Sequence, residues 1–142
     1  MISAILLAAG ESKRMNGQNK LTKKISGVPL IKLSVKNILE SYIDELIIII
    51  GHQSEDIKNI INKNKKIKFI FNNDYKSGVA SSIKLGLNNL SDQTKGFFIC
   101  LADMPLINKE IYNLLIKCLK NKKIIVPTYK KRQVNPVLFS KL

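Results

Sequence analysis

The chain has 142 residues, enough for one domain with a real hydrophobic core and too few for two ordinary domains. Hydrophobic residues make up 45% and charged residues 24%, and no apolar run is long enough for a membrane span, so we expect a cytoplasmic globular protein. The formal net charge of +14 favours anionic ligands through the general electrostatic field.

Short apolar runs alternate along the chain with helical patterns. The runs predict strands buried on both faces, at residues 3–8, 45–50, 67–71, 96–101 and 123–126. Apolar residues at helical spacing predict one helix after Pro29, a short one after Ser54, and a third behind Ser81 as its N-cap. The apolar faces of the third and fourth helices are predicted from Ile83, Leu87 and Leu90, and from Ile107, Ile111, Leu114, Leu115 and Cys118.

This order of elements predicts an α/β fold, with a mostly parallel sheet covered by helices on both faces. No internal repeat or linker divides the sequence, so we expect a single domain over residues 1–142. In such sheets, ligands bind at the carboxyl ends of the strands.

The two cysteines and the lone histidine predict no metal cluster or catalytic triad. Cys100 and Cys118 match no metal-ligand spacing and fall at apolar positions, so both are predicted to be core residues in a reducing compartment. His52 is the one histidine and cannot form a cluster by itself.

The predicted strand ends carry small, amide and acidic side chains, as a polyanion and a metal ion would need. Backbone N–H groups near Gly10 could approach phosphate oxygens, and Arg14 and Lys20 could neutralise their charge. Asp103 offers a hard oxygen ligand for Mg²⁺. Structural alternatives remain open: a turn at Gly10, helix caps at Asp103, Ser81 and Ser82, and turns at Asn72 and Asn73. The first loop matches neither a P-loop nor G-x-G-x-x-G.

Four stretches resemble sequence blocks of the molybdenum cofactor nucleotidyltransferases, with their MobA-like NTP transferase domain. They are LAAGESKRMNGQNKL, similar to L-A-A/G-G-x-S-x-R-M and a later lysine; NNDYKSGVASSIKLGL, similar to N-x₄-G-x₃-S-x₃-G-L; FFICLADMPLI, an apolar strand before D-M-P; and NPVLFSKL, similar to G-H-P-V-L-F. The four stretches follow the family's order and span nearly the whole chain.

The resemblance implies a Rossmann-like three-layer α/β/α fold of the nucleotide-diphospho-sugar transferase type and a Mg²⁺-dependent reaction. That reaction would transfer a nucleoside monophosphate from an NTP and release pyrophosphate. Members that have L-A-A-G are more often cytidylyltransferases, so Ala9 implies CTP as donor. The implied acceptor is the phosphate of a molybdopterin-type cofactor, and molybdenum hydroxylases or their maturation proteins are the implied partners.

The resemblance also implies roles for individual residues. Arg14, Lys20 and Asp103 would be catalytic, with Asp103 as the Mg²⁺ ligand and the two cations on the triphosphate. The implied nucleotide-binding residues are Leu7, Ala8, Ala9, Gly10, Lys20, Asn73, Gly78 and Ser82.

Two departures concern the acceptor half of the site. Relatives continue past the P-V-L-F block into a Gly-Asp segment that supplies a second metal carboxylate, whereas this sequence ends at Leu142, so we expect an NTP transferase domain that is short at its C-terminus. The expected Gly-His reads Val134-Asn135, and asparagine cannot carry a histidine's charge. The sequence therefore predicts a complete NTP half and an incomplete acceptor half.

Three other functions stay open. One is a related transferase, either a guanylyl transferase or one that loads a sugar or alcohol phosphate, and another is a shortened domain that binds nucleotide or a partner without turnover. The third is a basic nucleic-acid binder. Against it, all the basic residues except Arg14 and Arg132 are lysines spread along the chain, and aromatic stacking platforms are missing. We therefore expect neither a nucleic-acid nor a membrane partner.

Overall fold

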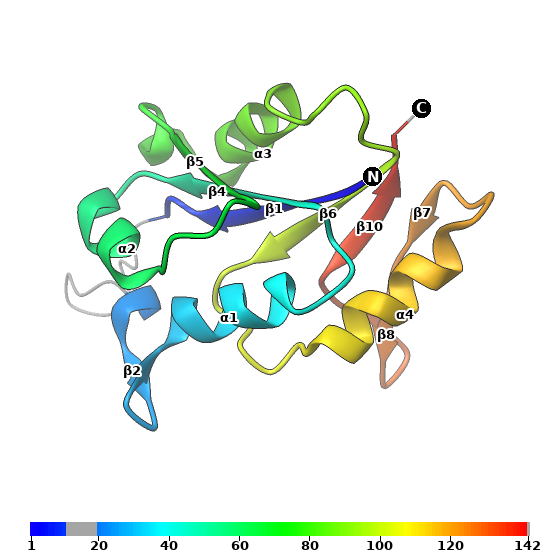
Figure 1. Ribbon diagram of the computed structural model, residues 1–142, viewed down its shortest axis with the longest axis horizontal. Helices are drawn as coiled ribbons and strands as arrows, with labels where there is room; N and C mark the ends of the chain where they lie inside the picture. The colour runs from blue at the N-terminus through cyan, green and yellow to red at the C-terminus, as the bar shows by residue number, and fades with distance from the viewer. Residues whose placement is uncertain (11–19, 142) are drawn as a thin grey trace.

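A six-stranded sheet runs through the centre of the molecule in the order β5-β4-β1-β6-β10-β7 (Figure 1). The structure is a computed structural model that describes residues 1–10 and 20–141. The strands of the sheet are β1 Ile2–Ala8, β4 Glu45–Ile50, β5 Ile67–Phe71, β6 Gly96–Leu101, β7 Ile124–Ile125 and β10 Val137–Ser140.

Four of these strands are parallel. β1 lies between β4 and β6, so that Ala4 is opposite Leu46 on one side and Phe98 on the other, and β5 pairs with β4. β10 runs antiparallel to both β6 and β7. The mostly parallel sheet and Rossmann-like architecture expected from the sequence are therefore confirmed. β10 is not among the strands predicted from the sequence, because its four residues lie within the NPVLFSKL motif and form no long apolar run.

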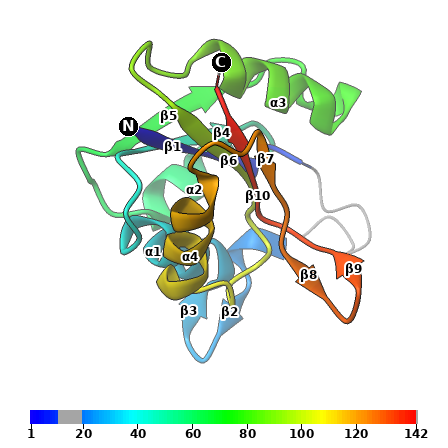
Figure 2. The same cartoon turned by 90° about the vertical axis from the view of Figure 1, so that its right-hand side faces the viewer.

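Helices cover both faces of the sheet. α1 Leu30–Leu39, α2 Ser54–Ile60 and α4 Lys109–Leu119 lie on one face, and α3 Val79–Asn88 lies on the other (Figures 1 and 2). Successive side chains of a strand point to opposite faces. In β1, Leu6 and Ala8 pack in the cluster with α1, α2 and α4, whereas Ile5, Leu7 and the following Ala9 pack on the side of α3.

Smaller elements complete the described part of the chain. Two 3₁₀ turns, η2 Lys20–Thr22 and η3 Tyr75–Ser77, lie near the carboxyl ends of the parallel strands. Two short hairpins join β2 Lys24–Ile25 to β3 Val28–Pro29, and β8 Thr128–Tyr129 to β9 Arg132–Gln133. In the described residues, every helix is too short or too polar to cross a membrane.

The buried face of α4 differs from the predicted one. Tyr112, Leu115 and Leu119 are buried, whereas Leu114 is 61% exposed and Cys118 is exposed. Both sets have helical spacing. The Tyr112 ring packs edge-on against Phe98, with centroids 5.3 Å apart, and this contact turns its stripe toward the sheet. The prediction that Cys118 is a core residue is therefore wrong, while that for Cys100 is confirmed.

α3 also packs differently from the prediction. The helix begins at Val79, so Ser81 lies inside it and is not its N-cap. Its fully buried positions are Ser82 and Gly86, while Leu87 is 40% exposed. A Cβ atom at Gly86 would lie 2.6 Å from Cγ2 of Ile5, so only a glycine allows the helix to lie this close to β1.

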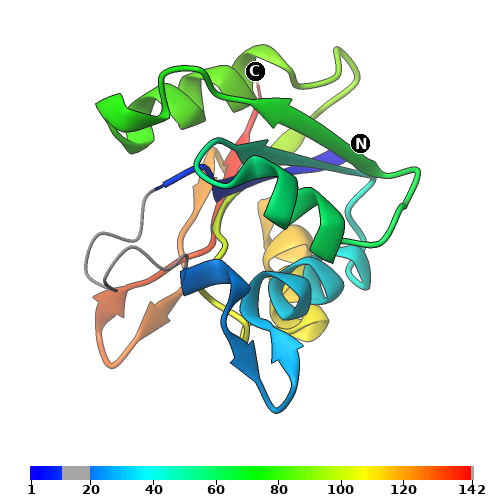
Figure 3. The ribbon, with the colours of Figure 1, turned by 90° about the vertical axis from the view of Figure 1, so that its left-hand side faces the viewer.

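The connections place a crevice between β1 and β6. From β1 the chain passes through α1, β4 and α2 to β5 at one edge, and α3 then crosses the other face to β6, on the far side of β1 (Figure 3). The strand order therefore reverses between β1 and β6. In open α/β sheets, ligands bind at this switch point, outside the carboxyl ends of the strands.

Candidate functional site

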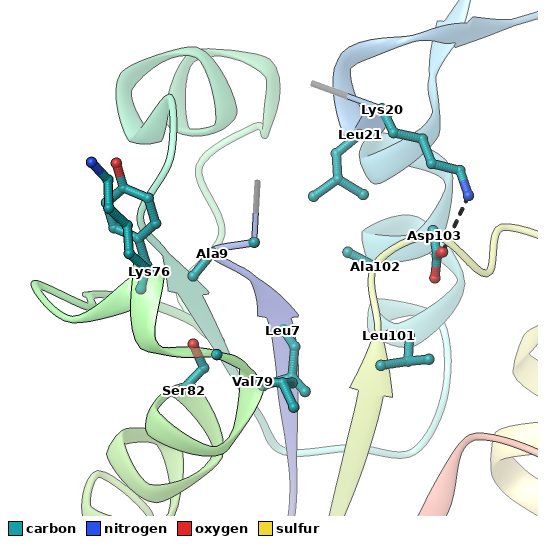
Figure 4. Close-up of a pocket in the computed structure, with 13 residues that line it drawn as sticks. Leu7, Ala9, Lys20, Leu21, Lys76, Val79, Ser82, Leu101, Ala102 and Asp103 are labelled. Carbon is teal, nitrogen blue, oxygen red and sulfur yellow. Dashed lines mark hydrogen bonds and ion pairs between the residues drawn. The ribbon is translucent and has the colours of Figure 1, made fainter. Parts of the chain in front are cut away.

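A cavity of about 460 Å³ lies at this switch point (Figure 4). Its lining comes from the ends of β1 and β6 and the residues directly after them, from η2, and from η3, Gly78 and the first turn of α3. The lining residues are Leu7, Ala9, Gly10, Lys20, Leu21, Tyr75, Lys76, Gly78, Val79, Ser82, Leu101, Ala102 and Asp103.

The cavity has two walls of different chemistry. Lys20 and Asp103 lie on one side of the β1 end, and Lys76, Val79 and Ser82 lie on the other (Figure 4). We call the first the charged wall (Lys20, Leu21 and residues 101–103) and the second the helix wall (residues 75, 76, 78, 79 and 82). The segment directly after β1 forms the floor: Ala9 lies between the two walls (Figure 4), and Gly10 also lines the cavity.

Lys20 and Asp103 form an ion pair across the charged wall. The Lys20 Nζ donates to Oδ2 of Asp103 at 3.3 Å, and the two side chains are 49% and 41% exposed. Exposed pairs of this kind contribute about 0–1 kcal/mol to stability. Breaking this ion pair therefore costs little free energy, so Lys20 can bind a phosphate group and Asp103 a metal ion instead.

α1 holds the backbone on both sides of Asp103. The Ser34 Oγ donates to the carbonyl oxygen of Ala102 at 2.7 Å, and the Asn37 Nδ2 donates to that of Pro105 at 2.7 Å. Ser34 is buried although it is polar. Neither residue was predicted from the sequence. Ser34 could have been, because a serine among the apolar positions of a predicted helix face indicates a buried hydrogen bond.

Residues 4–142 match the MobA-like NTP transferase domain. The chain belongs to this family. The family prediction made from the four sequence stretches is therefore confirmed, and by family the chain is a nucleotidyltransferase domain.

The chain is also similar to a curated protein in sequence and to solved structures in fold. The bifunctional protein GlmU of Staphylococcus epidermidis is 25% identical over 140 residues, which are 98% of this chain and 30% of GlmU. Rv0371c of Mycobacterium tuberculosis H37Rv has a TM-score of 0.88 at 20% identity, covering 99% of this chain and 71% of that one. A 4-diphosphocytidyl-2C-methyl-D-erythritol synthase from Anaerococcus prevotii has a TM-score of 0.79 at 19% identity, over 99% and 70%. The NTP transferase domain thus spans 23–30% of the length of the GlmU relatives that it matches, and the two solved structures share its fold.

The NTP transferase domain brings most of the predicted site residues to one cavity. Those that line it are Leu7, Ala9, Gly10, Lys20, Gly78, Ser82 and Asp103. Arg14 lies outside the described residues. Lining residues that the sequence analysis did not identify are Leu21, Tyr75, Lys76, Val79, Leu101 and Ala102. Among them, Lys76 adds a second cation to the cavity lining, and it lies within the NNDYKSGVASSIKLGL stretch.

Two predicted nucleotide-binding residues do not line the cavity. Ala8 is 0% exposed and its side chain packs in the cluster on the opposite face of the sheet, because alternation along β1 sends neighbours to opposite sides. A side-chain contact with nucleotide does not fit this placement. Asn73 is exposed, and its neighbour Asn72 is the buried residue at the end of β5.

Asp103 is a single carboxylate rather than part of a metal cage. Within the described ranges, 1–10 and 20–141, no three His, Cys, Asp or Glu side chains gather to hold a metal ion. Mg²⁺ usually keeps several waters and is held by one or two carboxylates together with substrate phosphates. One half-exposed aspartate beside a cavity of about 460 Å³ fits that mode of binding.

Proposed function

We propose that this domain transfers CMP from CTP to the phosphate of a molybdopterin-type cofactor and releases pyrophosphate. The observation that supports the proposal is the convergence of Gly10, Lys20 and Asp103 with Gly78 and Ser82 around one cavity. A backbone floor, a cation and a carboxylate are the components that a triphosphate with its metal ion requires.

Each wall has its own part in the proposed reaction. Among the described residues, none has an atom within 4 Å of a Cβ placed at Gly10, and this open backbone would allow phosphate oxygens to approach. Lys20 and Arg14 would bind the triphosphate, and Asp103 would hold Mg²⁺. The helix wall would contact the nucleoside through Gly78 and Ser82.

The chemistry needs no covalent nucleophile from the protein. An oxygen of the acceptor phosphate attacks the α-phosphorus, the bond from that phosphorus to the bridging oxygen breaks, and pyrophosphate leaves with the electron pair. Lys20 would neutralise the charge that develops on the leaving group. When bound, a divalent ion supplies charge neutralisation and orientation of phosphate oxygens. Rv0371c has been solved as a complex with manganese, at a TM-score of 0.82 and 17% identity, which supports a divalent ion here.

The donor is proposed to be CTP. Ala9 lies on the cavity floor and gives the first motif the L-A-A-G form of the cytidylyl branch. The name of the Anaerococcus neighbour describes a product that contains a diphosphocytidyl group, which also supports a cytidine nucleotide.

A sugar-phosphate or sugar-alcohol phosphate is the second candidate acceptor. The Anaerococcus enzyme, which shares the fold, is named for a methylerythritol product. Val134-Asn135 stands where the molybdopterin-type relatives have Gly-His, so the acceptor side lacks a residue pair that is characteristic of them.

Two measurements test these proposals in turn. Thermal unfolding is followed with CTP, GTP, ATP and UTP, each with and without Mg²⁺, because a ligand that binds only the folded state raises the melting temperature. We expect a shift with CTP that depends on Mg²⁺, and no shift with any NTP would contradict the proposal. Pyrophosphate release is then compared with molybdopterin and with a sugar-alcohol phosphate as acceptor. Release with the second compound alone would transfer the assignment to that acceptor, and release with neither would leave a nucleotide-binding domain without turnover.

A further inference from the structure

Asn72 is a buried polar residue next to the cavity whose side chain is fully engaged. It directly follows β5 and is 4% exposed. Its Nδ2 donates to Oγ of Ser81 and to Oγ of Ser82, each at 2.9 Å, and its Oδ1 accepts the backbone N–H of Asp74 at 2.9 Å. A carboxamide has two donor hydrogens and one acceptor oxygen, so these bonds use both hydrogens and the oxygen.

These bonds tie the end of β5 to the start of α3. The segment between them contains η3 and Gly78, which has φ 117° and ψ 178°, a backbone conformation that essentially only glycine adopts. The Ser81 Oγ lies within hydrogen-bond distance of two carbonyl oxygens of this segment, those of Asp74 at 3.1 Å and Gly78 at 2.8 Å. Asn72 thus anchors both ends of the segment that carries the helix wall.

The charged wall has separate anchors. Asp103 is held through the bonds of Ser34 and Asn37 to the backbone on either side of it, and both of these residues belong to α1. α1 and α3 lie on opposite faces of the sheet (Figure 2). A change at Asn72 should therefore move the helix wall and leave the charged wall in place.

We propose that Asn72 is a positioning residue that sets the shape of the nucleoside side of the cavity without contacting the nucleotide. The inference rests on the proposed function, in which the helix wall binds the nucleoside and the charged wall binds the phosphates. It deepens that function, because it makes the nucleoside side depend on one buried amide that does not line the cavity.

The test compares two ligands that use the walls differently. Under the proposed function, CTP would contact both walls, whereas pyrophosphate would need only the floor and the charged wall. We expect Asn72→Ala to weaken Mg²⁺-CTP binding about tenfold, as the loss of a buried hydrogen-bonding group implies, and to change Mg²⁺-pyrophosphate binding less than about twofold. Asn88→Ala is the matched control, since Asn88 is the exposed last residue of α3 and lies outside the cavity lining, and it should bind both ligands like the wild type.

A second variant covers the case in which Asn72→Ala does not fold. Ser81→Ala removes one partner of the amide and lies outside the cavity lining. It should weaken CTP binding about threefold, again without an effect on pyrophosphate. The double variant should lose less than the sum of the two single losses, because both residues belong to one network.

Hydrogen exchange tests the anchor without any nucleotide. The backbone N–H of Asp74, which donates to Oδ1 of Asn72, should exchange faster in Asn72→Ala than in Asn88→Ala. Equal weakening of CTP and pyrophosphate would show a general structural role and overturn the proposal, as would CTP binding that is unchanged in both Asn72→Ala and Ser81→Ala. If the wild type binds pyrophosphate but no NTP, the proposed function fails first, and the positioning role fails with it even where the exchange result stands.

Discussion

The Lys20 ammonium lies 3.3 Å from the Asp103 carboxylate and has 49% of its side chain exposed. It is the described cation best placed to meet a triphosphate on the charged wall. We expect Lys20→Ala to lower pyrophosphate release about 100-fold, since charge on the leaving group is then less well stabilised. The loss of the exposed ion pair itself should cost less than about 1 kcal/mol of unfolding free energy. Lys23→Ala is the control, and wild-type turnover in Lys20→Ala would refute the catalytic role.

Asp103 is the proposed metal ligand, and its neutral isostere separates charge from shape. Asp103→Asn keeps the size of the side chain and removes the negative oxygen that Mg²⁺ prefers. We expect CTP binding to lose its dependence on Mg²⁺ in a titration followed by calorimetry. Asp92→Asn provides the control, because Asp92 is exposed in the loop before β6, at the amino ends of the parallel strands and away from the cavity. An unchanged Mg²⁺ titration in Asp103→Asn would remove the carboxylate from the metal site.

The two thiols should differ sharply in reactivity. Burial raises the pKa of the Cys100 thiol from its ordinary 9.0 to about 12, whereas Cys118 is exposed on α4. Since the thiolate is the reactive form, one thiol should react quickly with a disulfide reagent at pH 8 in the native protein, and two in denaturant. Cys118→Ser should leave none that reacts quickly in the native state, and a fast reaction in that variant would contradict the burial of Cys100.

The same pKa shift gives a sign for the pH dependence of stability. Unfolding returns Cys100 to its ordinary pKa, so its thiolate favours the unfolded state once the pH exceeds 9.0. The contribution of the neutral buried thiol is therefore complete below pH 9 and is lost as the pH rises toward about 12.

The sequence could not show which of two adjacent asparagines is buried. Asn72 and Asn73 are chemically identical, and a spacing of four residues before Gly78 selected Asn73. The structure buries Asn72 instead, because Ser81 and Ser82 lie within reach of its amide. Nothing in a single sequence distinguishes two adjacent asparagines that leave a strand.

α3 links the packing of the sheet to the shape of the site. Gly86 allows the helix to approach Ile5, and the first turn of the same helix carries Val79 and Ser82 into the cavity lining. Gly86→Ala should cost about 1–3 kcal/mol of unfolding free energy through overpacking, more than the gain in helix propensity returns. It should also weaken CTP binding, because the helix wall shifts. Urea unfolding and calorimetry measure the two effects.

Control variants separate overpacking from a general effect on the helix. Lys84→Ala changes an exposed position of α3 and should stay within about 0.5 kcal/mol of the wild type. Ile5→Ala removes the Cγ2 atom that a new Cβ would meet, so the double variant should be less costly than the sum of its parts. Full additivity would show that the close contact between Gly86 and Ile5 carries no strain.

The elements that the sequence predicted best are the ones with a single packing solution. The parallel strands are continuous apolar runs, which only a sheet covered on both faces can bury. α4 offered two apolar stripes, and the choice between them depended on Phe98, a residue in a different element. β10 has four residues and lies between β6 and β7, so its strand character depends on partners distant in sequence.

The topology of the whole sheet explains why the site residues are far apart in sequence. Lys20 and Asp103 are separated by 83 positions and meet because β1 and β6 are parallel neighbours at the switch point. The apolar runs predicted where the strands end, and the family resemblance implied which residues form the site. Their meeting around one cavity required the strand order 5-4-1-6, which depends on α3 crossing the face opposite to α1 and α2.

The distribution of charge over the whole molecule predicts how salt will affect its ligands. The net charge of +14 comes almost entirely from lysines spread along the chain, so contacts with nucleic acid should be non-specific and lost through counterion competition. The proposed CTP site places its charges in one cavity. We therefore expect no binding of duplex or single-stranded DNA by about 10 µM protein at 150 mM KCl, whereas Mg²⁺-CTP binding should weaken only several-fold from 50 mM KCl.

Fluorescence anisotropy with labelled oligonucleotides measures DNA binding, and calorimetry measures Mg²⁺-CTP binding. Replacing Lys63 and Lys65 by glutamine removes two exposed charges from the loop between α2 and β5. Any DNA binding at 50 mM KCl should fall in this variant, while CTP binding stays at the wild-type value, because neither lysine lines the cavity. Nanomolar binding of DNA that persists at 150 mM KCl would mean that the lysines form an organised surface, and the exclusion of a nucleic-acid partner would then be wrong.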